Sequence, residues 1–436
     1  MEKDDLKNIK AKYKPRLIDE LIASSLPLSG ALLIKGPKWC GKTWTGAYFS
    51  NDVIEFQDEK IGRANKELAL LNPAELLDKE KPLLIDEWQE VESIWDAVRK
   101  KVDKNSEQNK YILTGSITPN YLNRDKENKK LHSGAGRIKQ ISMSTLTFNE
   151  IFHKNKISFK NTVNGIIDKN NYVGKLELRE LISFTIKGGW PHLVEFSTEN
   201  ARFILEGYID SLCGDDILKY RNVRLNSNII KKIILSWSRN VCTYVDYVTV
   251  YNDVLNFLDK KVSLQTFKTY IQIFTDMFIF DEIKPWLPNL RSKTRLRGIS
   301  KKIFTDPSLG CACIKATVDG FLNDLNYYGF FFENTVFKDL KVYASILGYE
   351  VFQYRDNANL EIDAIIEIDN LDYLAIEIKL GTNKIDEAIE NFKRFKKKME
   401  NGGYKQPKYC IVIVGVGGIY QIKEDVIIIP YDLLGF

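Results

Sequence analysis

The sequence predicts an α/β protein with more than one hydrophobic core. Short apolar runs alternate with amphipathic stretches towards both ends of the chain, which is typical of strands covered by helices. A third, purely helical periodicity separates these two regions. The 436 residues also exceed what one ordinary core holds, so two to four domains are expected.

Residues 1–150 are expected to form the first domain, a parallel sheet covered by helices. Apolar runs that stop at a glycine or a charged residue predict its strands, and the amphipathic segments between them predict its helices. The strand runs are ALLIKG, VIEFQ, PLLIDE and YILTGS, and the helical segments include NPAELLDKE and VESIWDAVRK.

Residues 151–205 are polar and weakly patterned, which indicates a linker and helical lid. Residues 206–305 have helical periodicity followed by a basic stretch, and this order predicts a winged-helix domain. Gln265, Lys268 and Thr269 would face outward on its recognition helix. Basic wings contact DNA phosphates in many proteins, although winged helices also serve as packing units with solvated basic loops. The basic side chains are Arg291, Lys293, Arg295, Arg297, Lys301 and Lys302.

Residues 306–436 return to a mixed α/β pattern and are expected to form the last domain. Apolar, β-rich runs predict four strands, and two long amphipathic segments predict helices. The strand runs are YEVFQYR, LEIDAIIEI, YLAIEIKL and YCIVIVG, and the helical segments are FFENTVFKDLKVYASILG and KIDEAIENFKRFKKKME.

The composition is that of an ordinary globular protein, with 44% hydrophobic and 28% charged residues. The net charge of +5 permits nucleic-acid binding only through local basic patches. Six scattered cysteines and three histidines do not form a zinc-binding pattern, so reduced thiols are expected. No apolar run is long enough to span a membrane and the charged N-terminus has no apolar signal region, so a cytoplasmic location is expected.

A glycine-rich segment follows the first predicted strand and matches the pattern GxxxxGK[ST]. Backbone N–H groups in such a loop, together with the start of the next helix, favour a polyphosphate. Lys42 would reach the β- and γ-phosphates of ATP, and the Thr43 hydroxyl would hold Mg²⁺. The predicted nucleotide-binding residues are Gly36, Pro37, Lys38, Trp39, Cys40, Gly41, Lys42, Thr43 and Trp44.

An acidic pair ends the third apolar run. Asp86 could hold Mg²⁺ through water, and Glu87 could polarise the attacking water. A solvated acidic strand end is the alternative, but the upstream phosphate loop disfavours it. The sequence therefore predicts an ATP and Mg²⁺ site that uses both carboxylates.

Two polar residues further along complete the predicted catalytic set. Ser116 ends the fourth apolar run and could orient water near the γ-phosphate, or could be a simple turn residue. Arg137 follows a stretch of small residues and could complete a neighbouring molecule's site as an arginine finger. A structural salt bridge is the alternative for Arg137.

The segments GPKWCGKTWT, LLIDEWQEV, YILTGSITP and SGAGRI resemble the successive motifs of prokaryotic AAA-type ATPases with a C-terminal domain of unknown function. The resemblance covers essentially the whole chain, including GGWP where the family has GGYP. It implies nucleotide binding by Lys42 and Thr43, an acidic pair at Asp86 and Glu87, a sensor at Ser116 and the family arginine at Arg137. Trp44 replaces the usual second threonine and leaves the phosphate loop intact.

A second set of charged residues lies in the last domain. Asp363 falls in one predicted strand of a hairpin, and Glu377 and Lys379 share one face of the next. Two carboxylates on adjacent strands can share Mg²⁺ beside a lysine. This arrangement resembles the PD-(D/E)xK, restriction-endonuclease-like fold, in which Glu333 matches an acidic helix position. Alternating charge on half-exposed strands is the alternative.

Two functions of different classes are predicted, ahead of a third alternative, a plain signalling NTPase that does not act on nucleic acid. In the first, an ATPase acts on DNA through the winged helix and the nuclease-like domain. In the second, an ATP-dependent regulator or scaffold, in defence or toxin control, uses a catalytically silent nuclease-like domain to bind a protein partner. A homo-oligomer is compatible with both functions, because AAA-type cores often form rings.

Overall fold

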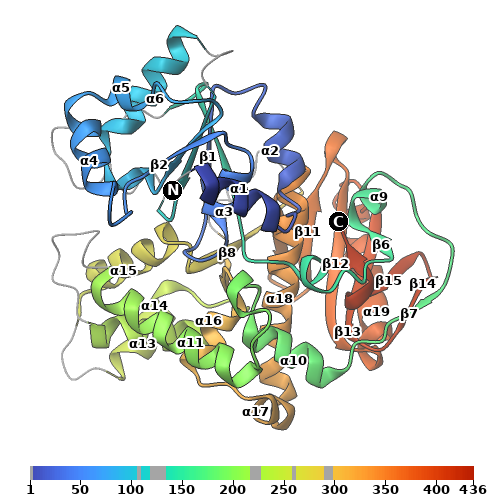
Figure 1. The fold of residues 1–436 in the computed structure, drawn as a ribbon. Coiled ribbons are helices and arrows are strands. Elements are labelled where there is room, and N and C mark those ends of the chain that lie inside the picture. The colour runs from blue at the N-terminus through green and yellow to red at the C-terminus, as the bar shows by residue number, and fades with distance from the viewer. Residues whose placement is uncertain (1–2, 106–109, 118–133, 217–226, 258–261, 289–297) are drawn as a thin grey trace. The chain divides into compact units, whose positions relative to one another are not determined.

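The computed structural model describes residues 3–105, 110–117, 134–216, 227–257, 262–288 and 298–436 (Figure 1). These residues divide into two compact units. Unit 1 comprises Met1–Thr145 with Asp276–Phe278, and unit 2 comprises Leu146–Thr275 with Ile279–Phe436.

Unit 1 is a parallel sheet with helices between its strands, as the sequence predicts, but it has five strands, and the fifth (Ile138–Ser142) was not predicted. The strand order is β2-β3-β4-β1-β5, so β4 lies between β1 and β3. The strands are β1 (Ala31–Lys35), β2 (Asp52–Glu55), β3 (Leu83–Asp86), β4 (Tyr111–Gly115) and β5 (Ile138–Ser142). The helices are α1 (Lys3–Lys12), α2 (Asp19–Ser25), α3 (Lys42–Tyr48), α4 (Gly62–Leu71), α5 (Pro73–Leu76) and α6 (Ser93–Lys104).

Helices cover both faces of this sheet because alternate strand residues point to opposite sides. Leu32 and Ile34 of β1 join a core formed with α1, α2 and α3. Ala31 and Leu33 join the opposite core, which α4, α5 and α6 complete. Burial on both faces explains why β1, β3 and β4 read as continuous apolar runs rather than as alternating ones, whereas the edge strand β5 has exposed Lys139 and Gln140.

Unit 2 combines helices with a large mixed sheet. Its helices are α8 (Phe148–Phe152), α9 (Phe159–Val163), α10 (Leu178–Lys187), α11 (Thr198–Ser211), α13 (Ser227–Arg239), α14 (Tyr247–Leu255), α15 (Leu264–Asp276), α16 (Pro307–Cys313), α17 (Val318–Asn323), α18 (Leu325–Ile346) and α19 (Ile385–Asn401). Side-chain caps fix where several of them begin: Asp324 accepts from the Tyr327 N–H at the start of α18, and Asp306 caps α16.

A mixed nine-stranded sheet, in the order β7-β14-β15-β13-β12-β11-β10-β8-β9, forms the rest of unit 2. A separate pair joins β6 to β16. The strands are β6 (Ile157–Ser158), β7 (Tyr172–Val173), β8 (Phe280–Pro285), β9 (Lys301–Phe304), β10 (Val351–Arg355), β11 (Glu361–Glu367), β12 (Tyr373–Gly381), β13 (Tyr409–Val416), β14 (Ile419–Lys423), β15 (Val426–Pro430) and β16 (Leu434–Gly435).

The helices α13, α14 and α15 are followed by the antiparallel pair β8 and β9, which is the element order expected of a winged helix. Gln265 and Lys268 of α15 are exposed and Thr269 is half-buried. The strand pair is not a free wing, however, because β8 also pairs in parallel with β10 of the large sheet. The predicted phosphate contacts Arg291, Lys293, Arg295 and Arg297 lie outside the described residues.

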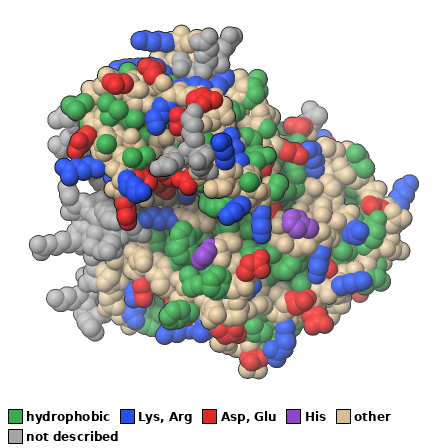
Figure 2. Space-filling view, in the orientation of Figure 1, with side chains coloured by type: hydrophobic (Ala, Val, Ile, Leu, Met, Phe, Trp, Pro, Cys, Tyr) green, Lys and Arg blue, Asp and Glu red, His purple; other side chains and the backbone are tan. Residues whose placement is uncertain are grey.

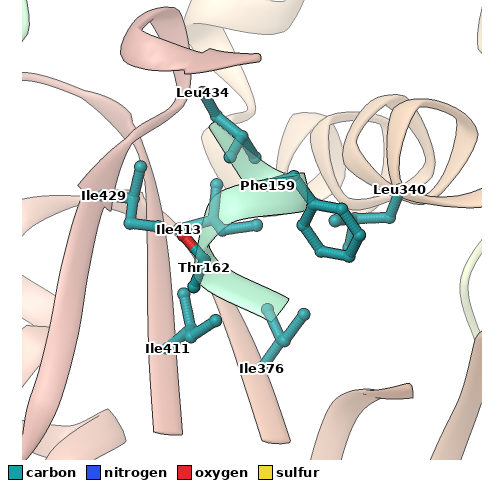
Figure 3. Close-up of a pocket in the computed structure, with 8 residues that line it drawn as sticks. All are labelled: Phe159, Thr162, Leu340, Ile376, Ile411, Ile413, Ile429 and Leu434. Carbon is teal, nitrogen blue, oxygen red and sulfur yellow. The ribbon is translucent and has the colours of Figure 1, made fainter. Parts of the chain in front are cut away.

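The central strands of the large sheet are covered on both faces. Ala375 of β12 packs into the core that α19 completes. On the other face, apolar side chains of β12, β13 and β15 meet those of α9 and α18 around a small apolar pocket (Figure 3). The pocket is lined by Phe159, Thr162, Leu340, Ile376, Ile411, Ile413, Ile429 and Leu434. Glu377 follows Ile376 and therefore lies on the α19 side.

Two further findings concern membrane-spanning helices and the cysteine thiols. In the described part of the chain, no helix combines the length and the apolar character that crossing a membrane requires. All six cysteines are described, and each is a free thiol.

Candidate functional site

The predicted phosphate loop connects the end of β1 to the start of α3, and two of its glycines have geometric reasons to be glycine. Gly41 has φ 103°, a conformation that favours glycine. A Cβ on Gly36 would lie 2.0 Å from the Met143 carbonyl oxygen. The loop therefore packs too tightly against the backbone of Met143, the residue after β5, to accept a side chain at Gly36.

Lys42 is buried at the first position of α3, with 5% of its surface exposed. Its Nζ donates to the Pro37 carbonyl oxygen at 2.8 Å, so the side chain folds back over the loop. A polyphosphate would replace this carbonyl as the acceptor. Trp39 and Trp44 are 52% and 44% exposed beside the loop, and Cys40 is buried.

The N-terminal segment supports the loop, which sequence reasoning missed. Arg16 donates to the Cys40 carbonyl at 2.9 Å and to the Ser144 carbonyl at 3.1 Å. The Tyr13 hydroxyl donates to Asp19 at 2.8 Å and lies 3.0 Å from the Thr45 hydroxyl. No local motif marks Tyr13 or Arg16, because the partners that connect them to the loop region lie 24 to 128 residues further along the chain.

Asp86 meets the end of the phosphate loop at the carboxyl edge of the sheet. Its Oδ1 accepts from the Thr43 hydroxyl at 2.8 Å and from the Thr114 hydroxyl at 2.5 Å. Burial raises the pKa of Asp86 to about 6, although these hydroxyl groups oppose the shift. Thr114 reaches this position because β4 lies between β1 and β3.

Glu87 lies next to Asp86 in a left-handed conformation with φ 51°. Its Oε2 accepts from the Ser116 hydroxyl at 3.3 Å and from the Gln89 side-chain amide. Its backbone N–H donates to the Thr114 hydroxyl at 3.2 Å. Ser116 thus lies beside the acidic pair, and Gln89 is a member of this group that sequence reasoning missed.

Arg137 does not join this group within the chain. Its backbone carbonyl accepts from the N–H of Ala31 at the start of β1, whereas the phosphate loop follows the end of β1. Its Nε donates to Asp103 at 2.7 Å. The expected action of Arg137 on a neighbouring molecule stays a prediction. Within the single chain, Arg137 forms a salt bridge, as the alternative describes.

The residues around the phosphate loop fit ATP and Mg²⁺. Lys42 offers a buried ammonium group that a backbone carbonyl holds at the loop. Thr43 and Asp86 offer a hydroxyl and a carboxylate in mutual contact, and Mg²⁺ prefers oxygen ligands of this kind.

The raised pKa of Asp86 leads to a prediction about stability. A carboxyl whose pKa is higher in the folded than in the unfolded protein favours folding when protonated, and this advantage is lost as the pH rises through 6. Asp86→Asn is therefore expected to stabilise the nucleotide-free protein at pH 7.5 by about 3 kcal/mol. Urea unfolding should show this difference at pH 7.5 and a smaller one at pH 5. A variant less stable than the wild type at both pH values would contradict the prediction.

The second predicted site lies in unit 2, where β11 and β12 form the expected antiparallel hairpin. Asp363 and Glu377 stand opposite each other on it. Lys379 Nζ lies 2.5 Å from Glu377 Oε2 and 3.4 Å from Asp363 Oδ2. The Ile378 N–H donates to Asp363 Oδ2 at 2.8 Å, and the Asn391 amide of α19 donates to Glu377 Oε1 at 2.7 Å.

Lys301 of β9 enters the same cluster. Its Nζ lies 2.6 Å from Glu333, 2.8 Å from Glu361 and 3.4 Å from Asp363 Oδ1. Burial raises the pKa of Glu333 to about 7 and that of Glu377 to about 8. Burial acts in the same direction on Asp363, but the ammonium groups of Lys379 and Lys301 outweigh it and hold its pKa at about 2.

The expectation that Lys301 and Lys302 contact phosphates is wrong. They are 1% and 3% exposed, because Lys301 enters the carboxylate cluster and Lys302 pairs with Glu282 at 2.7 Å. The expected metal site also does not fit. The described residues contain no group of three or more His, Cys, Asp or Glu side chains able to hold a metal. Glu333, Asp363 and Glu377 surround lysine ammonium groups instead.

Comparison with protein-family models divides the chain into three parts. Residues 29–152 match an AAA domain. Residues 178–319 match a domain of unknown function (DUF8612), and residues 328–434 match another (DUF4143). No match was found among curated proteins. The chain therefore contains a P-loop ATPase domain of the AAA type.

Several solved structures are similar to the chain at low identity. A Walker-type ATPase of Pyrococcus abyssi, PABY2304, is 12% identical over 70% of this chain and 97% of its own, with a TM-score of 0.44. AMPPCP-bound DnaA from Aquifex aeolicus is 14% identical over 61% of this chain and 89% of its own, with a TM-score of 0.30. The Aeropyrum pernix ORC2 protein is 11% identical over 76% of this chain and 98% of its own, with a TM-score of 0.23. Similarities this distant do not assign a substrate or partner.

Proposed function

We propose that the AAA-type ATPase domain of this chain hydrolyses ATP with Mg²⁺ between the phosphate loop and Asp86–Glu87, and that turnover is coupled to DNA binding by unit 2. The observation that supports the catalytic part is the 2.8 Å contact between the Thr43 hydroxyl and Asp86. This contact brings together two groups that the sequence assigns to the metal. Glu87 lies next to them, as the proposed hydrolysis requires.

Each residue of the proposed site has one role. The loop N–H groups and Lys42 bind the phosphates, and Thr43 and Asp86 hold the metal. Bound Mg²⁺ offsets the negative charge that develops on the phosphate oxygens. Glu87 orients water and takes up its proton, while Ser116 holds the Glu87 carboxylate by the 3.3 Å hydrogen bond.

Coupling to DNA is proposed from the basic sequence between β8 and β9. Arg291, Lys293, Arg295 and Arg297 supply four cations within seven residues. The described basic side chains on the face in Figure 2 are interspersed with acidic ones, which is typical of a solvated surface. The four clustered cations are the candidates that we propose for phosphate contacts.

The DNA proposal predicts a steep dependence on salt. Four phosphate contacts should weaken DNA binding roughly 100-fold between 50 and 200 mM salt. Duplex DNA should raise the ATPase rate at 50 mM salt, and replacement of the four basic residues by alanine should remove the stimulation relative to each protein's own basal rate. Fluorescence anisotropy and phosphate release measure the two effects. A wild-type ATPase rate indifferent to DNA at low salt would contradict the coupling.

The second candidate function is an ATP-dependent regulator or scaffold whose unit 2 binds a protein partner. The burial of Lys301 and Lys302 favours it, because both are withdrawn from the basic surface expected for DNA. Domain boundaries at 150, 205 and 305, a cytoplasmic location, and a homo-oligomer in which Arg137 acts on a neighbour remain proposals within either function.

A further inference from the structure

Lys301 is one of the most deeply buried cations among the described residues of unit 2, and it has no part in the proposed ATPase chemistry. Its side chain is 1% exposed and lies among Glu333, Glu361 and Asp363. The Tyr244 ring lies 4.9 Å from its ammonium group. A lysine is seldom buried unless acidic partners surround it, so this position is specified by the cluster.

The ammonium group cannot easily leave. Lys301 pairs with Ile283 in the β8–β9 ladder, and the carbonyl of the next residue accepts from the Cys242 N–H at 2.7 Å. The strand is therefore held on both sides. An exposed lysine could turn into solvent when a metal arrives, but withdrawal of Lys301 would leave Glu333, whose side chain is 14% exposed, without the ammonium group that it contacts.

The oxygen atoms that a metal would need already accept hydrogen bonds. Asp363 Oδ1 faces Lys301, and Asp363 Oδ2 accepts from the Ile378 N–H. Both oxygens of Glu377 are also occupied, one by Lys379 and the other by Asn391. A divalent ion would have to displace these donors and lie beside two ammonium charges.

We propose that Lys301 is a built-in cation that takes the place of the divalent metal in the carboxylate cluster of unit 2, and so closes this site to metal. The side chain contributes one charge and three donors to carboxylates that a nuclease would use as ligands. Unit 2 then has the strand arrangement of a nuclease-like site without its metal chemistry. This inference does not depend on the proposed ATPase mechanism or on DNA.

The test is Mn²⁺ binding by calorimetry, with Lys301→Met as the main variant. Every protein carries Asp86→Asn, so that the ATPase site does not add a carboxylate ligand. Lys301→Met removes the ammonium group and leaves the carboxylates, and should bind Mn²⁺ at least about tenfold more tightly than its parent. Lys302→Met is the matched control, because it removes a neighbouring buried ammonium that pairs with Glu282 outside the cluster. It should behave like the parent.

A further variant, Asp363→Asn, keeps the test decisive if Lys301→Met does not fold by circular dichroism. If Lys301 closes the site, the parent and Asp363→Asn titrate identically with Mn²⁺. Mn²⁺ binding by the parent that Asp363→Asn removes would overturn the proposal. Metal-dependent cleavage of DNA that requires Asp363 would overturn it as well, as would a folded Lys301→Met that binds no more Mn²⁺ than its parent.

Discussion

Replacement of Glu87 by Gln is expected to lower the rate of ATP hydrolysis at least about 100-fold while ATP binding persists. The glutamine keeps the size of the side chain and can still contact Ser116, but it cannot take up a proton from water. The phosphate loop and Asp86 are unchanged, so the affinity for ATP should change little. Phosphate release under single-turnover conditions and a fluorescent ATP analogue measure the two quantities separately.

Lys42→Ala provides the contrasting variant. Loss of the ammonium that now contacts the Pro37 carbonyl should abolish both binding and turnover, because no other described side chain of the loop places a buried cation there. The exposed Trp39 and Trp44 give a fluorescence signal close to the loop for following ATP binding. Unchanged hydrolysis in both Glu87→Gln and Lys42→Ala would refute the catalytic assignment.

Gly189→Ala is expected to destabilise unit 2 by about 3 kcal/mol or more. A Cβ on Gly189 would lie 2.0 Å from the carbonyl oxygen of Leu146 and 2.8 Å from its nitrogen. Both are backbone atoms, and the Leu146 N–H donates to the Gly189 carbonyl at 2.7 Å, so neither segment can move away without loss of that bond. Trp190, which follows, is fully buried and donates to Ser308 at 2.9 Å.

Gly329→Ala is the matched control for this prediction. Gly329 lies within α18, and a Cβ there would meet no atom within 4 Å. Alanine is a better helix former than glycine, so this variant should be neutral or more stable by up to about 1 kcal/mol. Chemical denaturation of the two variants measures the contrast. Equal stability of Gly189→Ala and the wild type would show that the close backbone contact with Leu146 does not exclude a side chain at position 189.

The fold of unit 1 follows closely from local pattern. Its strands β1, β3 and β4 are buried on both faces, so they appear in the sequence as short, continuous apolar runs, and the helices between the strands show amphipathic periodicity. The phosphate loop could also be predicted from local sequence, because its strand end, turn and helix start lie within about 15 residues of one another. The hairpin of β11 and β12 was predicted for the same reason, since its two strands are joined by one short turn.

The sequence by itself determined these short-range features: the alternating elements, the phosphate loop, the acidic pair and the Asp363, Glu377 and Lys379 set. Tertiary structure alone decided which distant side chains meet. Thr114 reaches Asp86 only because the sheet order places β4 beside β3, and Arg16 reaches the loop across 24 residues. Lys301 meets Glu333 and Asp363 across 32 and 62 residues, and thereby changes a predicted metal site into an internal ion-pair cluster. The physical reason is that periodicity reports which face of an element is buried, but not which charged groups share that burial.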